Sequence, residues 1–143
     1  METNENLDDI QPFCFDDIEK FSDETLNQFF TKIDEIPHII ANSKESFLNK
    51  LTTLKKIGLF ITINLILDSQ ISTTMQIKML KFWDFLFSTS SSSEELDILF
   101  SDGIINKLIF YSFDVSSIEI LQSYMTVLKG ISLKAKFNND SKK

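Results

Sequence analysis

Residues 102–136 decide the fold of this chain, and their sequence is DGIINKLIFYSFDVSSIEILQSYMTVLKGISLKAK. Apolar residues recur there every three or four positions, the spacing of amphipathic helices. A polar corner divides the stretch into a short helix and a long one. Ser116 followed by Glu119 predicts a capping box at the start of the long helix. Val115 and Ile120 predict a hydrophobic staple beside it.

The rest of the chain also favours helices. Only three glycines and two prolines occur in 143 residues, and an all-β domain would need more of both for its turns. Residues 57–67 are rich in β-branched side chains and alternate in places, so a strand is an alternative there. We expect a helix because a lone strand would have no partner. The sequence therefore predicts one all-α domain, since a chain of this length can bury a core.

Start and stop signals divide the first half of the chain into helices. Ser22 is expected to cap a helix over 23–35, and Pro37 is expected to kink that helix or to restart it as a further turn. Ser43 is expected to cap the next helix. Whether that helix continues into the apolar run or breaks near residues 55–58 stays open at this point.

The second half of the chain has similar signals. A helix is expected over 74–88, followed by a serine-rich loop. The end of that loop predicts a capping box, formed either by Ser91 with Glu94 or by Ser92 with Glu95. A glycine is expected to end the resulting short helix before the one over 104–111 begins.

The apolar positions repeat when the chain is shifted by 48 residues. The repeating unit is a short, a middle and a long helix, and armadillo and HEAT units have similar periods of about 40–47 residues. The last helix has two apolar stripes, as expected of a helix wedged between stacked neighbours. We therefore expect an armadillo/HEAT-like right-handed α-solenoid of about 2.5 repeats. Matching pairs include Leu51 with Leu99, Phe60 with Leu108 and Trp83 with Ile131, and the stripes are Ile118-Leu121-Met125-Leu128 and Ile120-Tyr124-Val127-Ile131.

Charge is distributed unevenly along the chain. Residues 1–36 hold 11 acids and 2 lysines, whereas residues 37–143 hold 10 acids and 12 lysines. We expect an acidic, disordered tail over 1–21, a helical domain over 22–136 and a polar tail over 137–143. The 14 basic residues are all lysines, and the absence of arginine argues against nucleic acid as a partner. Four apolar residues allow one amphipathic turn of the tail to pack on the domain: Phe13, Phe15, Ile18 and Phe21.

Residues that could support catalysis are few. His38 is the single histidine and Cys14 the single cysteine, so a zinc site or a disulfide is not expected. The acidic surroundings of Cys14 should raise its pKa and disfavour a thiolate. No glycine-rich phosphate loop occurs. We therefore expect no enzyme, no cofactor and no metal, with a small enzyme using His38 and acidic residues as the alternative. The adjacent acid pairs are Asp8-Asp9, Asp16-Asp17 and Glu94-Glu95.

Membrane contact is a further alternative. The most apolar run, Ile57 to Leu67, has 11 residues and is shorter than the roughly 20 needed to span a bilayer. Lysines near the C-terminus could contact an anionic membrane surface weakly. They are Lys129, Lys134, Lys136, Lys142 and Lys143.

Residues 113–134 resemble the signature of the FPL-domain family, the N-terminal domain of the endosomal-maturation-defective trafficking proteins. The resemblance covers roughly residues 24–136. Ser123 stands where that family has a tyrosine, Gly130 replaces a larger residue, and the segment that names the family does not follow, so the chain resembles a truncated member. The matching residues are Phe113, Asp114, Ser116, Glu119, Tyr124, Leu128, Lys129, Ser132, Leu133 and Lys134.

The resemblance implies a function as well as a fold. It implies an armadillo-like, non-catalytic scaffold for protein–protein interaction in endosome–lysosome trafficking and autophagy. It also implies a cytoplasmic protein that can be peripheral on endosomal or lysosomal membranes. An open solenoid end would seek a protein partner or self-associate.

Overall fold

The computed structural model describes residues 7–14, 22–101 and 103–141, and the regular structure within these ranges is helical. The prediction of an all-α fold is confirmed. The elements are η1 (Leu7–Phe13), α1 (Asp23–Asn42), α2 (Phe47–Lys56), α3 (Leu59–Ile66), α4 (Thr73–Thr89), α5 (Ser93–Leu99), α6 (Ile104–Phe110) and α7 (Ile118–Ser141).

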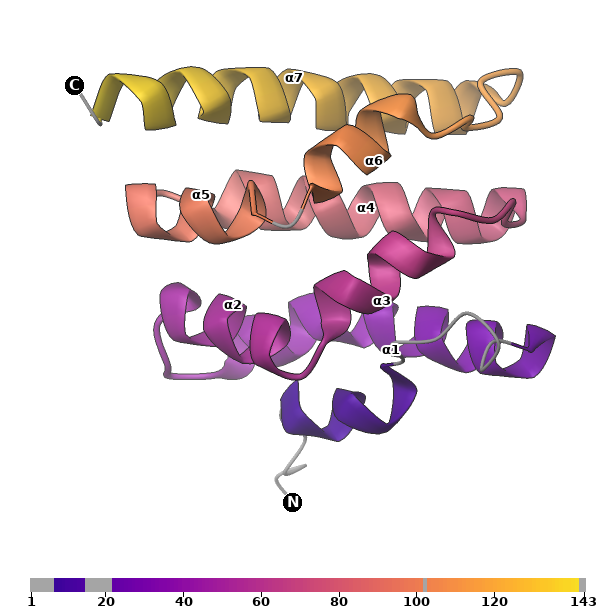
Figure 1. Cartoon of the computed structure of the whole chain (residues 1–143), viewed down its shortest axis with the longest axis horizontal. Coiled ribbons are helices and arrows are strands. Elements are labelled where there is room, and N and C mark those ends of the chain that lie inside the picture. The colour runs from indigo at the N-terminus through magenta and orange to yellow at the C-terminus, as the bar shows by residue number, and fades with distance from the viewer. Residues whose placement is uncertain (1–6, 15–21, 102, 142–143) are drawn as a thin grey trace.

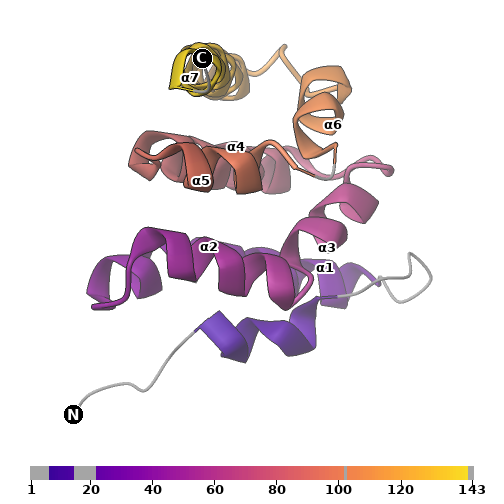
Figure 2. The same cartoon turned by 60° about the vertical axis from the view of Figure 1, so that its left-hand side comes forward.

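The helices form successive layers (Figures 1 and 2). The long helices α1, α4 and α7 lie one above another and run in the same direction across Figure 1. α4 contacts both α1 and α7, while α2 contacts α5 and α3 contacts α6. η1 packs against α1 and α2 at the end of the stack opposite α7. α7 is therefore the outermost layer at the C-terminal end.

Aromatic residues fill the middle of the core. Trp83 on α4 is fully buried, and its ring stacks on Phe60 of α3 with centroids 5.8 Å apart. Phe82 and Phe87 contact the same indole ring at 5.9 Å. These contacts join α3 to α4, and Phe87 extends the cluster to Phe100 beyond α5. Burial of such large rings is the main source of stability in a domain of this kind.

α1 continues through Pro37, which corrects the expectation of a break or a separate turn. Proline removes one helical hydrogen bond and costs about 3 kcal/mol in a helix interior. Ile36 and Ile40 flank it on the buried face, and burying each such side chain contributes about 1.5–3 kcal/mol. The apolar stripe therefore outweighs the proline. Ser22 caps the N-terminus as predicted, accepting from the Thr25 N–H at 3.1 Å.

The start of α2 differs from the prediction. Ser43 follows the last residue of α1, and Ser46 is the residue that caps α2, by accepting from the Asn49 N–H at 3.1 Å. Lys50 of α2 stabilises the corner between α1 and α2. Its buried ammonium donates to Ile40 O at 2.6 Å and to Ser43 O at 3.3 Å, so a positive charge satisfies carbonyls at the end of α1.

Two glycines begin the middle helices. Gly58 (φ 90°) precedes α3 and Gly103 (φ 71°) precedes α6, and both have left-handed backbones that favour glycine. The apolar run is helical, as expected, and it is separated from α2 at Gly58. Gly103 was expected to end α5, but its left-handed turn lies at the start of α6.

Local signals placed α4 and α5 correctly. α4 has the expected position and begins at a further serine cap, Ser72. The capping box of α5 is the one formed by Ser92 and Glu95. Glu95 Oε1 accepts from the N–H groups of Ser91 and Ser92, at 2.7 and 3.2 Å.

Part of the expected acidic tail is structured. Residues 7–13 form η1, and its Leu7 and Ile10 are buried in the core. Residues 7–13 therefore pack on the domain, as the amphipathic-turn alternative allowed, but with Leu7 and Ile10 as the buried residues. Phe13 is half-buried, and Lys32 lies 5.4 Å from the centre of its ring. The other three residues of that alternative, Phe15, Ile18 and Phe21, lie outside the described residues.

Candidate functional site

The family-signature residues begin at the corner between α6 and α7. Phe113 is buried there between two tyrosines, with ring centroids 4.7 Å from Tyr111 and 4.9 Å from Tyr124. Tyr124 on α7 donates its hydroxyl to Ile109 O at 2.7 Å. Burial raises the pKa of both tyrosines. The corner is therefore a packed aromatic joint that fixes α7 relative to α6.

Two side chains attach this corner to the layer below. Gln76 of α4 is buried, donates to Ile71 O at 2.9 Å and accepts from the Asp114 N–H at 2.7 Å. The Tyr111 hydroxyl accepts from the Ile71 N–H and donates to Ser69 O, each at 3.0 Å. The corner before α7 is thereby locked to the corner before α4.

The start of α7 differs from the predicted capping box. The Ser116 hydroxyl and N–H both donate to Asp114 Oδ1, so this serine belongs to a turn before the helix. Ser117 takes the capping position and accepts from the Ile120 N–H at 3.4 Å. Val115 is exposed, so the predicted staple with buried Ile120 does not form.

The remaining signature residues divide into two groups. Lys134 donates to Ser90 O at 2.8 Å and so binds the end of α4. Glu119 is exposed and forms an ion pair with Lys81 at 3.6 Å. Leu128 is half-buried, and three members lie exposed on α7: Lys129, Ser132 and Leu133. The signature thus combines residues that hold α7 in place with residues that face outward.

The two apolar stripes of α7 have opposite environments. The stripe of Ile120, Tyr124, Val127 and Ile131 faces inward, and its three aliphatic members are buried. In the other stripe, Ile118 is 72% exposed, Leu121 40% and Met125 60%. We call residues 118, 121, 125, 128 and 132 the outer face of α7. They lie on one side of the helix because they are spaced by three and four positions.

Exposed large apolar residues gather at this end of the described structure. Seven of the eight belong to α6, the corner or α7, and the eighth is Ile61 on α3. Such clustering is typical of an interaction surface, because single exposed apolar residues are normally scattered. The seven are Ile109, Phe110, Val115, Ile118, Leu121, Met125 and Leu133.

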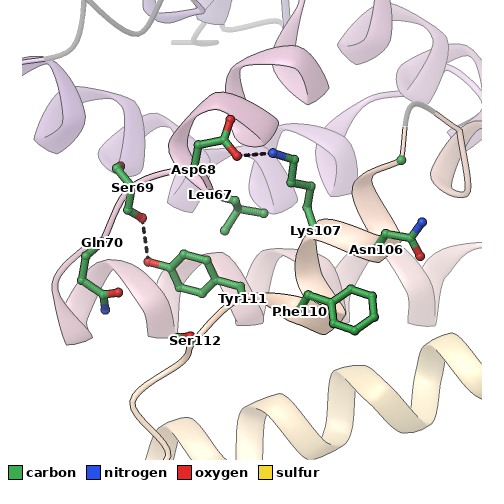
Figure 3. Close-up of a pocket in the computed structure, with 10 residues that line it drawn as sticks. Leu67, Asp68, Ser69, Gln70, Asn106, Lys107, Phe110, Tyr111 and Ser112 are labelled. Atoms are coloured by element: carbon green, nitrogen blue, oxygen red, sulfur yellow. Dashed lines mark hydrogen bonds and ion pairs between the residues drawn. The ribbon is translucent and has the colours of Figure 1, made fainter.

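An open hollow of about 510 Å³ lies beside the corner, between the end of α3 and α6 (Figure 3). Lys107 of α6 pairs with Asp68 across it, and Tyr111 reaches Ser69 on its other side. Phe110 is 82% exposed at its edge. Lys107 and Asp68 neutralise each other, and their ion pair joins α6 to the segment after α3. Neither charge is therefore left to attract an ionic ligand into the hollow.

The residues considered for catalysis lie elsewhere. His38 is exposed on α1, and its ring contacts Asn42 Nδ2, at 3.1 Å from Nε2. It therefore lies on the surface, whereas the enzyme alternative needs it in a pocket beside a carboxylate. No group of three or more His, Cys, Asp or Glu that could hold a metal occurs among the described residues.

The pKa of the Cys14 thiol is raised to about 11, mainly by burial, and a hydrogen bond with Thr62 acts in the opposite direction. Its Sγ lies 3.6 Å from Ile10 O, within η1. The sequence predicted this direction from nearby acids, but the cause is burial of the thiol beneath the domain.

Three residues, two at this corner and one between α1 and α2, have roles that sequence reasoning missed. Gln76, Tyr111 and Lys50 each join segments 10 or more positions apart. A polar residue within an apolar helical stripe is the signal that could have identified Gln76, because a buried amide needs partners. Lys50 carries the same signal, because it lies in the stripe of Leu51 and Leu54, whereas Tyr111 carries none.

A protein-family model matches the part of the chain that contains this corner and α7. Residues 32–141 match the model of FPL, described as an uncharacterised conserved protein. The chain belongs to the FPL family. No curated protein matches it significantly, and no solved structure does. The matched range includes α4, the aromatic joint and α7, so the FPL match covers the outer face of α7.

Among the described residues of this FPL-family chain, no helix combines the length and apolarity needed to cross a bilayer.

Proposed function

We propose that this chain is a non-catalytic helical scaffold that binds another protein through the outer face of α7. The observation that carries the proposal is the exposure of apolar residues at one end of the layers, above all Ile118 and Met125. Removal of such residues from water contributes about 25 cal/mol per Å², so a covered outer face is favoured over an exposed one.

The proposal includes an armadillo-like, right-handed α-solenoid. Its support is that local landmarks recur at nearly constant separation. Gly58 and Gly103, which begin α3 and α6, lie 45 positions apart, and the caps Ser46 and Ser92 lie 46 apart. These separations replace the shift of 48 suggested by the apolar pattern. Long helices that each contact the next layer are the arrangement expected of stacked repeats.

The cellular setting we propose is endosome–lysosome trafficking and autophagy, in the cytoplasm or peripherally on endosomal and lysosomal membranes. Its support is the resemblance of residues 113–134 to trafficking proteins and the FPL family match. A fluorescently tagged chain should overlap endosomal and lysosomal markers in its native cell. A diffuse distribution with no overlap would contradict this setting.

A paired-variant capture experiment tests the binding function. The double variant Leu121→Glu/Met125→Glu places charge on the outer face, and Ile61→Glu does the same at an exposed apolar residue on α3. Both should keep the circular dichroism of the parent chain. Proteins cross-linked to the parent in native cells should be lost from the double variant and kept by Ile61→Glu. An unchanged set in the double variant would refute binding through α7.

A further inference from the structure

α4 has a buried face whose members are spaced like the outer face of α7 itself. Gln76, Leu80, Trp83 and Phe87 are spaced by four, three and four positions, and all are buried. At one end of this face Gln76 binds the Asp114 N–H. At the other end, a Cβ on Gly130 of α7 would lie 3.7 Å from Phe87 Cβ. α7 and the corner before it therefore adjoin both ends of this face, while Trp83 between them also stacks on Phe60 of α3.

The outer face of α7 occupies the same register one layer later. Leu121, Met125, Leu128 and Ser132 each lie 45 positions after the corresponding α4 residue, and 45 is also the separation of Gly58 and Gly103. α7 thus offers a partner the kind of surface on which α7 itself is seated. This equivalence identifies the shape of the occupant as one long amphipathic helix.

The charge on the outer face of α7 indicates which kind of amphipathic helix could bind there. Lys129 and Lys136 are exposed and lie four positions beyond Met125 and Ser132, on the same side of α7. They have no ion-pair partner among residues 22–101 and 103–136, whereas Glu119 is turned to Lys81. The first half of the face is therefore apolar and the second half basic.

Resting on the proposed function, we infer that the outer face of α7 binds an amphipathic helix of another protein, with apolar residues in one half and acidic residues in the other. Acidic side chains opposite Lys129 and Lys136 would complement their charge, and apolar ones would cover Ile118, Leu121 and Met125. The bound helix would run parallel to α7, as α7 runs parallel to α4 (Figure 1). A second copy of the chain fits less well, because its own outer face repeats the two lysines.

Two synthetic peptides of about 18 residues would test the inference, a length that permits a stable helix. Both carry leucines at positions i, i+4, i+7 and i+11, and their C-terminal halves carry either glutamates or lysines on the same side. Labelled peptides would be titrated with the full chain and followed by fluorescence anisotropy. The acidic peptide should bind at least about tenfold more tightly than the basic one at low salt, and the difference should shrink as salt is added.

Variants assign the binding to named residues. Leu121→Glu/Met125→Glu should abolish binding of the acidic peptide, and Ile61→Glu should leave it unchanged. Lys129→Glu/Lys136→Glu should reverse the preference, so that the basic peptide binds more tightly. Circular dichroism and thermal unfolding would confirm that each variant is folded.

Several results would overturn the inference while leaving the proposed function intact. They are equal binding of both peptides, binding that the variants do not change, and no binding of either peptide. Flotation with phosphatidylserine vesicles in the absence of peptide binding would identify a membrane as the occupant. A dimer in light scattering that Met125→Glu dissociates would identify a second copy. The proposed function itself fails if the capture experiment gives the same proteins for parent and outer-face variant, or if vesicles occupy the outer face.

Discussion

Gln76 holds Asp114 at the start of the outermost layer: its side-chain oxygen accepts the Asp114 N–H at 2.7 Å, while its amide donates to Ile71 O at 2.9 Å. One buried side chain thus joins two corners that are far apart in sequence. Because the outer face of α7 depends on the position of its first turn, this amide positions the proposed binding surface without contacting a partner.

Replacement of Gln76 by leucine should destabilise the chain by about 2–4 kcal/mol. The Ile71 carbonyl and the Asp114 N–H would lose their partner, and an unsatisfied buried polar group costs about 1–3 kcal/mol. Urea denaturation measures the change in the free energy of unfolding. Gln70→Leu, at an exposed position, is the matched control and should change it by less than about 0.5 kcal/mol. Equal effects at the two positions would contradict the assigned role.

The two tyrosines of the aromatic joint should differ in their response to loss of the hydroxyl group. Tyr111→Phe removes hydrogen bonds with Ile71 and Ser69, whereas Tyr124→Phe removes one with Ile109. A net contribution of about 1 kcal/mol per bond predicts roughly twice the destabilisation for Tyr111→Phe. The ring contacts with Phe113 remain in both variants, so each is the control for the other. The reverse order, measured by urea denaturation, would disprove the assignment.

Lys50→Met should lower the free energy of unfolding by about 1–2 kcal/mol. Methionine keeps an apolar stem but removes the ammonium group that donates to Ile40 O at 2.6 Å and to Ser43 O at 3.3 Å, so Ile40 O keeps only the weaker bond from the Ser43 N–H, at 3.3 Å. Relief of the cost of burying the charge offsets part of the loss. Lys56→Met, at an exposed position on the same helix, should have almost no effect. Chemical denaturation of both variants gives the comparison, and a more stable Lys50→Met protein would show that burial of the charge dominates.

Cys14 should react slowly with iodoacetamide in the native chain. A thiol pKa of about 11, against 9.0 for an ordinary cysteine, means about 100-fold less thiolate at pH 8. The unfolded chain should react at the ordinary rate, which mass spectrometry can follow. Fast alkylation of the folded chain at pH 8 would show that the thiol is not buried as described.

The same thiol predicts how stability depends on pH. Because the thiol pKa is raised in the folded state, its contribution is fully present below pH 9 and is lost as the pH rises towards 11. Cys14→Ser should remove that part of the decline. A decline of the same size in parent and variant would assign it to other groups, such as the two tyrosines with raised pKa values.

Features that depend on nearest neighbours along the chain could be predicted from the sequence. The capping box of Ser92 and Glu95 and the cap at Ser22 join residues three positions apart, so the pattern contains both partners. The two apolar stripes of α7 could also be predicted, because their members are three or four positions apart along the chain. The predicted capping serine was wrong where two serines lie close together. Ser46, not Ser43, accepts the N–H at the start of α2, and Ser117, not Ser116, does so at the start of α7.

Long-range contacts could not be predicted. Lys50 and Ile40 are 10 positions apart, and Gln76 and Asp114 are 38 apart, so no local spacing links them. Pro37 was misjudged because its local cost was known but the burial of Ile36 and Ile40 was not. Which stripe of α7 is buried depends on where α4 lies, and the position of α4 is set by contacts between helices that are far apart in sequence.

The position of η1 limits how large an assembly could become. Leu7 and Ile10 already cover the stack at the end formed by α1 and α2, whereas α7 leaves the opposite end available. A copy that joined through the outer face of its α7 would meet, at the other end of the described structure, a layer that η1 already covers. We therefore expect association through α7 to be pairwise, so raising the concentration of this chain should yield a defined complex instead of open-ended growth.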